Sequence, residues 1–161
     1  MILSHYAAQP LEALKPTNAA EGHTPYKPRG LWLSVDGEDD WPAWCVSEGF
    51  GLDRLKVRHA VTLRADARIL HLRDANELVA FTREFAKPEP SHRDSMYIDW
   101  EKVGAKHQGL IIAPYCWQKR LDLMWYYGWD CASGCIWDVS AIKTFEVDPA
   151  WVAPASREEA A

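Results

Sequence analysis

The segment WYYGWDCASGCIWD, residues 125–138, says most about how this chain folds. Aromatic side chains crowd its first half, and small residues in its second half begin a predicted strand over 133–139. Aromatic residues offer a stacking surface, and small residues let a ligand approach the backbone, so the junction is a candidate binding loop. Asp130 places a carboxylate there. The alternative is core packing, which we favour more for Trp137 than for Trp129.

Working outward from that segment, the sequence predicts several short strands. Each is a run of β-favouring or continuous apolar residues, bounded by glycine, proline or charged residues. The predicted strands cover residues 1–8, 30–34, 57–63, 67–72, 110–113, 133–139 and 141–147.

Three aspartates mark predicted helix starts, because a carboxylate at the N-cap accepts hydrogen bonds from free backbone N–H groups. Asp40 precedes a short helix that carries two tryptophans. Asp74 resembles the start of a capping box and leads into an amphipathic helix that nearby prolines end. Asp99 begins a predicted helix over 100–107, for which Gly109 is the expected terminator.

Length and composition indicate one folded α+β domain. The chain has 161 residues, of which 48% are apolar and 25% charged, a balance that excludes disorder throughout. Strands and helices do not alternate regularly, which disfavours a doubly wound fold. We predict a domain over 1–151 with an irregular, proline-containing loop at 9–30, followed by a disordered tail at 152–161.

Charge and hydropathy restrict the partners and the compartment. The formal charge is −5, from 18 basic and 23 acidic residues, which argues against broad nucleic-acid wrapping but leaves a local contact open. No stretch reaches the roughly 18 apolar residues that a membrane span requires, and the first residues do not resemble a secretory signal. We therefore expect a cytoplasmic protein without a membrane partner.

The common catalytic motifs are absent from the sequence. It contains no Gly-x-x-x-x-Gly-Lys, Gly-x-Gly-x-x-Gly, His-Glu-x-x-His or Gly-x-Ser-x-Gly pattern. Cys131 and Cys135 have a spacing that zinc sites use, but the second pair that such sites usually contain is missing. We therefore predict free thiols and no metal, with a zinc-supported domain as the alternative.

The order of several short motifs resembles the ADP-ribosyltransferase family, in the histidine-first branch that includes diphtheria toxin and the poly-ADP-ribose polymerases. His5 and Tyr6 lie in the first predicted strand, the sequence GLWLS at 30–34 forms the second, and Asp130 precedes a late strand. The layout is also similar to small phage-encoded anti-CRISPR ADP-ribosyltransferases. The resemblance covers most of residues 3–147 and implies a split, mixed β-sandwich with a few helices.

This resemblance implies that NAD is the substrate and that a macromolecule, either protein or nucleic acid, accepts the ADP-ribose. It implies that His5 bonds the ribose next to adenine, and that the Tyr6 main chain holds the nicotinamide amide. Trp41 or Trp44 is expected to stack on the nicotinamide ring. The other residues expected to line the NAD pocket are Trp32, Ser34, Trp129 and Ser133.

The sequence departs from the family at the catalytic acid. The family usually carries a glutamate in a late strand, whereas the sequence SGC at 133–135 has no acid. Cleavage of the nicotinamide–ribose bond develops oxocarbenium character, which a nearby carboxylate stabilises. Asp130 is the predicted catalytic residue and Glu48 the reserve. The alternative function is a non-catalytic aromatic-rich module that binds a protein or single-stranded nucleic acid by stacking.

Overall fold

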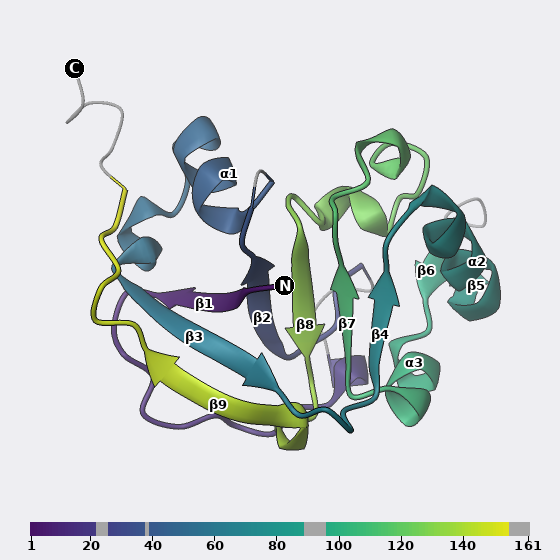
Figure 1. Ribbon diagram of the computed structural model, residues 1–161. Coiled ribbons are helices and arrows are strands. Elements are labelled where there is room, and N and C mark those ends of the chain that lie inside the picture. Colours follow the sequence, from purple (N-terminus) through teal and green to yellow (C-terminus); the bar gives the residue numbers. More distant parts are fainter. Residues whose placement is uncertain (22–25, 38, 89–95, 155–161) are drawn as a thin grey trace.

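Seven strands form one curled, mixed sheet in the computed structural model, which describes residues 1–21, 26–37, 39–88 and 96–154 (Figure 1). The α+β class with a mixed sheet is confirmed. One pair of neighbouring strands, at the edge formed by residues 69–72 and 109–112, runs parallel. Every other neighbouring pair in the sheet is antiparallel. From edge to edge the order is β4 (Ile69–Leu72), β7 (Gly109–Ile112), β8 (Ser133–Ile136), β2 (Leu31–Val35), β1 (Leu3–Ala7), β3 (Val57–Leu63) and β9 (Ile142–Val147).

The sheet splits between β1 and β2. These strands share two residue pairs in register, the last being Ser4↔Ser34, whereas β1 and β3 share five. The Ile2 carbonyl accepts the Asp36 N–H at 3.1 Å on the β2 side. Because backbone groups of alternate strand residues face the same neighbour, the N–H and C=O of Tyr6 also face that side. The register with β2 has ended by then, so the Tyr6 backbone faces the split.

Three α-helices begin where the aspartates predict them. In each case the aspartate carboxylate accepts a hydrogen bond from a backbone N–H in the first turn. Within the described ranges, no helix is long and apolar enough to cross a membrane. The three pairs of cap and helix are Asp40 with α1 (Trp41–Glu48), Asp74 with α2 (Ala75–Phe85) and Asp99 with α3 (Trp100–Lys106).

Two predictions along the chain are wrong, and one pair of strands was not predicted. Gly109 does not terminate α3, because the helix ends three residues earlier and Gly109 is the first residue of β7. The helix α2 does end ahead of Pro88, but the strand that follows it was not predicted: β5 (Ala86–Pro88) pairs antiparallel with β6 (Met96–Ile98). The strand predicted over 133–139 stops at position 136, and a 3₁₀ turn follows.

The predicted loop and tail are only partly described. Within 9–30, the structure has a 3₁₀ turn at Ala19–Glu21, whereas positions 22–25 lie outside the described residues. Most of the tail predicted at 152–161 lies outside them as well, from position 155 onward.

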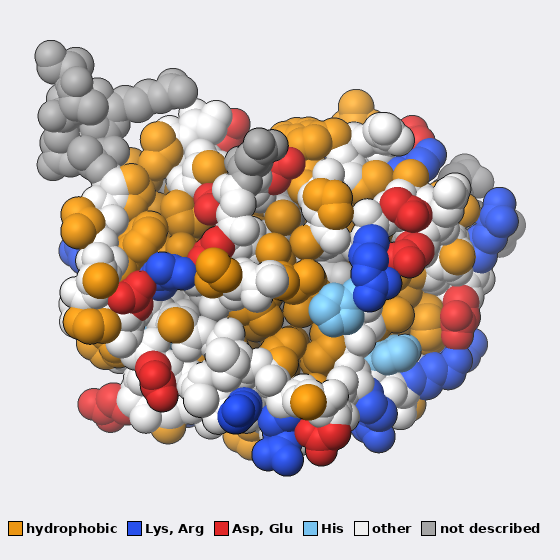
Figure 2. Space-filling model, viewed as in Figure 1, with side chains coloured by type: hydrophobic (Ala, Val, Ile, Leu, Met, Phe, Trp, Pro, Cys, Tyr) orange, Lys and Arg blue, Asp and Glu red, His pale blue; other side chains and the backbone are white. Residues whose placement is uncertain are grey.

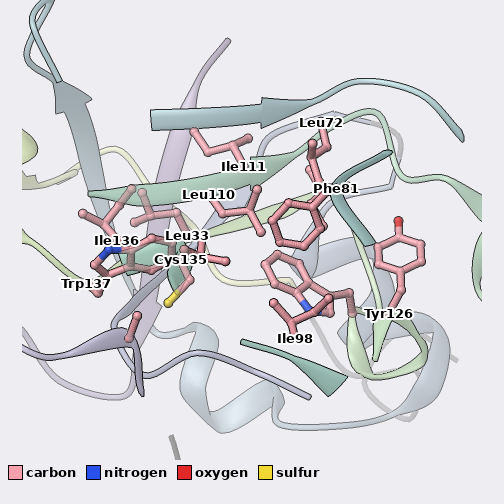
Figure 3. Packing of buried hydrophobic residues seen from close by; sticks show 14 of the residues in the cluster. Leu33, Leu72, Phe81, Ile98, Leu110, Ile111, Tyr126, Cys135, Ile136 and Trp137 are labelled. Atoms are coloured by element: carbon pink, nitrogen blue, oxygen red, sulfur yellow. The ribbon is translucent and has the colours of Figure 1, made fainter. Parts of the chain in front are cut away.

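One hydrophobic core joins the sheet to α2 and α3, and the aromatic segment 125–138 contributes much of it (Figure 3). Leu33 and Leu110 from the sheet pack with Phe81 of α2 in this cluster. Trp137 is 3% exposed, so its predicted place in the core is confirmed. The other fully buried aromatic side chains of the segment are Trp125, Tyr126 and Trp129.

Glycine at position 134 lets β7 and β8 pack closely. A Cβ there would lie 2.7 Å from Ile111 Cγ1 and 2.8 Å from the Leu110 carbonyl oxygen, which is backbone. We expect Gly134→Ala to lower the free energy of unfolding by about 1–3 kcal/mol, because this strand must shift to accept the methyl group. Urea unfolding measures the effect. Ala60→Ser, at an exposed position of β3, is the control and leaves stability unchanged.

His59 is a buried histidine whose contacts require the neutral ring. Its ring is 1% exposed and stacked on Phe145, Nε2 accepts the Leu11 N–H at 3.1 Å, and Nδ1 lies 3.4 Å from the His5 carbonyl. These contacts suit only the neutral ring, and burial lowers the pKa of His59.

A lowered folded-state pKa means that the unfolded chain binds the proton more readily. The stability contributed by neutral His59 is therefore complete above the unfolded value of about 6.5 and is lost as pH falls below it. Urea unfolding at several pH values measures this. We expect wild type to lose more stability than His59→Gln between neutral pH and pH 5, and equal losses would contradict the assignment.

Candidate functional site

A pocket of about 300 Å³ opens where β1 and β2 separate. Figure 2 shows hydrophobic side chains over the middle of this face of the molecule, with acidic ones among them. The walls come from β1, β2, the start of α1, and the loop that leads into β8. The lining residues are Ser4, His5, Tyr6, Lys27, Trp32, Leu33, Ser34, Trp41, Arg54, Trp129, Asp130, Cys131 and Ser133.

His5 connects the two separated strands. Its Nδ1 lies 2.8 Å from the Trp32 carbonyl oxygen. A carbonyl only accepts, so Nδ1 carries the proton and Nε2 is left as an acceptor. Burial lowers the pKa of His5, although the Trp32 carbonyl acts in the opposite direction. A neutral His5 therefore presents an acceptor suited to a hydroxyl donor such as that of a ribose.

Tyr6 follows on the same strand, and its backbone N–H and C=O face the split in the sheet. An amide ligand needs both a donor and an acceptor side by side, and one strand residue supplies them. The Tyr6 ring packs on Trp151 with centroids 5.1 Å apart. Burial raises the pKa of its hydroxyl to about 12, so the phenol stays neutral.

Two tryptophans form one wall of the pocket. The rings of Trp32 and Trp129 meet edge to face with centroids 4.8 Å apart. Trp129 was favoured less than Trp137 as a core residue, but it is fully buried and also lines the pocket. Its indole N–H is buried and has no hydrogen-bond partner among the residues that the structure describes.

The start of α1 forms another wall, with Trp41 lining the pocket. The Ser34 hydroxyl accepts the Trp41 N–H at 3.0 Å, which fixes the helix start against β2. Trp44 is not among the lining residues; its ring stacks on Trp41 with centroids 5.0 Å apart and planes 14° apart. Of the two candidates for stacking on a ligand, the geometry therefore favours Trp41, with Trp44 behind it.

Asp130 is the acid at the pocket. Its carboxylate lies 3.8 Å from the Lys27 ammonium and 3.5 Å from the Arg120 guanidinium, and 23% of its side chain is exposed. Burial raises the pKa of Asp130, the two cations oppose that rise, and Glu48 adds to it. The carboxylate is thus partly withdrawn from water but held near two positive charges.

The remaining predicted site residues differ in whether they line the pocket. Ser133 lines it, and its hydroxyl donates to the Cys131 carbonyl at 3.0 Å. Glu48 is exposed at the end of α1 and does not line it, so the reserve acid acts on the pocket only through its charge on Asp130. Cys131 and Cys135 are buried free thiols, and the described part of the chain holds no metal-binding cluster.

Sequence reasoning missed three cations at or beside the pocket. Lys27 and Arg54 line it, and Arg120 reaches Asp130 from outside the lining. Lys27 lies between prolines in a segment without periodicity, and Arg120 follows a 3₁₀ turn of no recognisable motif. Only the fold brings them together.

Comparisons with protein-family models, with curated proteins and with solved structures found no match to this chain.

Proposed function

We propose that this protein is a mono-ADP-ribosyltransferase, which cleaves NAD at the nicotinamide–ribose bond and transfers ADP-ribose to a macromolecule. The observation that carries the proposal is one pocket that brings His5, the Tyr6 backbone and Trp41 together with the carboxylate of Asp130. These residues lie far apart in sequence, and each has the chemistry that one part of NAD requires.

The proposed binding mode assigns a group to each part of the nicotinamide riboside. The Tyr6 N–H and C=O bond the carboxamide, while Trp41 stacks on the pyridinium ring, whose positive charge favours an aromatic face. The neutral His5 ring accepts a hydrogen bond from a ribose hydroxyl.

Asp130 supplies the electrostatic part of the reaction. The bond between the ring nitrogen and the ribose carbon breaks, and its electron pair stays with nicotinamide. Positive charge then develops on the ribose, and a carboxylate in a partly desolvated site stabilises it. A nucleophile of the acceptor attacks the ribose carbon and releases its proton, which completes the transfer.

A titration with NAD tests the proposal directly. Tryptophan fluorescence reports binding, because several tryptophans line or adjoin the pocket, and chromatography measures released nicotinamide. We expect saturable quenching together with nicotinamide release, either slowly to water or faster with an acceptor. No change in fluorescence and no release at millimolar NAD would overturn the proposal.

A second candidate function is a non-catalytic module that binds a protein or single-stranded nucleic acid. It is favoured by a set of exposed hydrophobic side chains that do not line the pocket. These are Trp117, Leu121, Met124 and Tyr127. Binding of single-stranded nucleic acid through phosphates weakens steeply with salt, whereas an aromatic protein contact hardly changes. Binding to a single-stranded oligonucleotide that weakens steeply with salt would identify nucleic acid as the partner. Absence of such binding would favour a protein partner.

A further inference from the structure

Arg120 is half-buried and contacts two aromatic rings as well as Asp130. Its guanidinium lies over the rings of Trp117 and Tyr127, 5.7 and 5.4 Å from their centroids. Only 27% of its side chain is exposed, and its buried Nε has no hydrogen-bond partner in the part of the chain that the structure describes. Stacking on aromatic faces suits the planar guanidinium and restricts the directions in which it can point.

The Trp117 ring beneath Arg120 is 54% exposed but makes two contacts of its own. The indole N–H of Trp117 donates to the Asp39 carboxylate at 3.2 Å, and its ring meets Tyr115 edge to face with centroids 4.7 Å apart. The Asp39 carbonyl accepts the Ala132 N–H at 2.7 Å. The support of Arg120 and the loop that carries Asp130 are therefore tied to the same turn before α1.

The other cation near Asp130 is less constrained. Lys27 lies 3.8 Å from the second carboxylate oxygen, and 39% of its side chain is exposed. Its ammonium also lies 5.2 Å from the Trp32 ring centroid, inside the pocket. A ligand that enters the pocket meets Lys27, whereas Arg120 approaches the carboxylate from outside the lining and can keep its contact.

We propose that Arg120 is the positioning residue for Asp130, holding its carboxylate in one orientation at the pocket while substrate binds and reacts. This inference rests on the proposed function. Arg120 does not contact the reacting atoms; it acts through Asp130. The charged groups that act on Asp130 are Lys27, Arg120 and Glu48, so removing Arg120 leaves one cation and one anion.

Carbon-detected NMR of the Asp130 carboxyl, together with the pH dependence of nicotinamide release, tests the inference. The variants are Arg120→Met, Arg120→Lys, and Arg64→Met as a matched control, since Arg64 pairs with Asp66 on an exposed turn. In Arg120→Met we expect the Asp130 titration and the acidic limb of kcat to move to higher pH, because a favourable charge is lost. We expect kcat at neutral pH to fall on the order of tenfold to a hundredfold.

Arg120→Lys keeps the charge without the planar fork, so it should retain the wild-type titration but recover only part of kcat. It also keeps the test open should Arg120→Met fail to fold, as checked by thermal unfolding. An unmoved Asp130 titration in folded Arg120→Met would overturn the inference. The titration needs no NAD, so a wild-type protein without nicotinamide release would overturn the proposed function separately.

Discussion

Asp130→Asn is expected to reduce nicotinamide release from NAD on the order of 10²–10³-fold, while leaving NAD binding and thermal stability almost unchanged. Asparagine keeps the size of the side chain but cannot supply the negative charge that stabilises an oxocarbenium-like transition state. The carboxylate lies 3.5 Å or more from its cationic partners, and partly exposed pairs of this kind contribute little to folding. Nicotinamide release at saturating NAD measures the change in kcat.

Two carboxylates serve as controls for Asp130→Asn. Asp122→Asn removes an acid just before the aromatic segment, one that pairs with Lys119 away from the pocket, and should leave kcat unchanged. Glu48→Gln removes the reserve acid, which the structure places outside the pocket lining, and should change kcat by less than about tenfold. A large loss in Glu48→Gln with a normal rate in Asp130→Asn would reverse the assignment of the two acids.

The parts of the fold that the sequence could predict are those set by local chemistry. An aspartate before an apolar face needs only its own next turn to act as a cap, and Asp40, Asp74 and Asp99 all do so. Strands of β-favouring residues were found to within a few positions for the same reason. Pairing partners are different, because they depend on residues far along the chain: Ser34 of β2 pairs with Ser4 of β1 and, on its other side, with Ser133 of β8.

The site could be predicted only in part. The resemblance indicated His5, Tyr6 and Trp41, and the fold brings them to one pocket with Asp130. It could not distinguish Trp41 from Trp44, because their difference depends on which ring faces the pocket and which packs behind it. It gave no sign of Arg120, whose role depends on two rings and a carboxylate placed around it by tertiary packing.

The aromatic segment also explains how a loop can hold a carboxylate in place. Trp125 and Trp129 are at most 1% exposed, so the residues on both sides of the loop tip are anchored in the core. Asp130 directly follows one of these anchors, and the strand β8 begins soon after it. Core packing and ligand binding were treated as alternatives for this segment, but the structure combines them. Its tryptophans are buried in the core, and its acid lines the pocket.

Trp41→Ala is expected to weaken NAD binding by about 1–3 kcal/mol, which corresponds to roughly a 5- to 150-fold larger Kd. The reason is the loss of the stacking face that lines the pocket, whereas the remaining hydrogen-bonding groups stay in place. Isothermal titration calorimetry is the suitable measurement, because the substitution itself removes a fluorophore. Trp41→Phe keeps an aromatic face of smaller area and should lie between alanine and wild type.

Trp44→Ala is the matched control, because it makes the same substitution at the other tryptophan of the stacked pair. Trp44 does not line the pocket, so its loss affects NAD only through the looser packing of Trp41 and of Phe50, which meets both rings edge to face. We expect the Kd of Trp44→Ala to rise less than that of Trp41→Ala, even where the two variants lose similar thermal stability. Equal losses of affinity would mean that the helix α1 as a whole, rather than the face of Trp41, contributes to NAD binding.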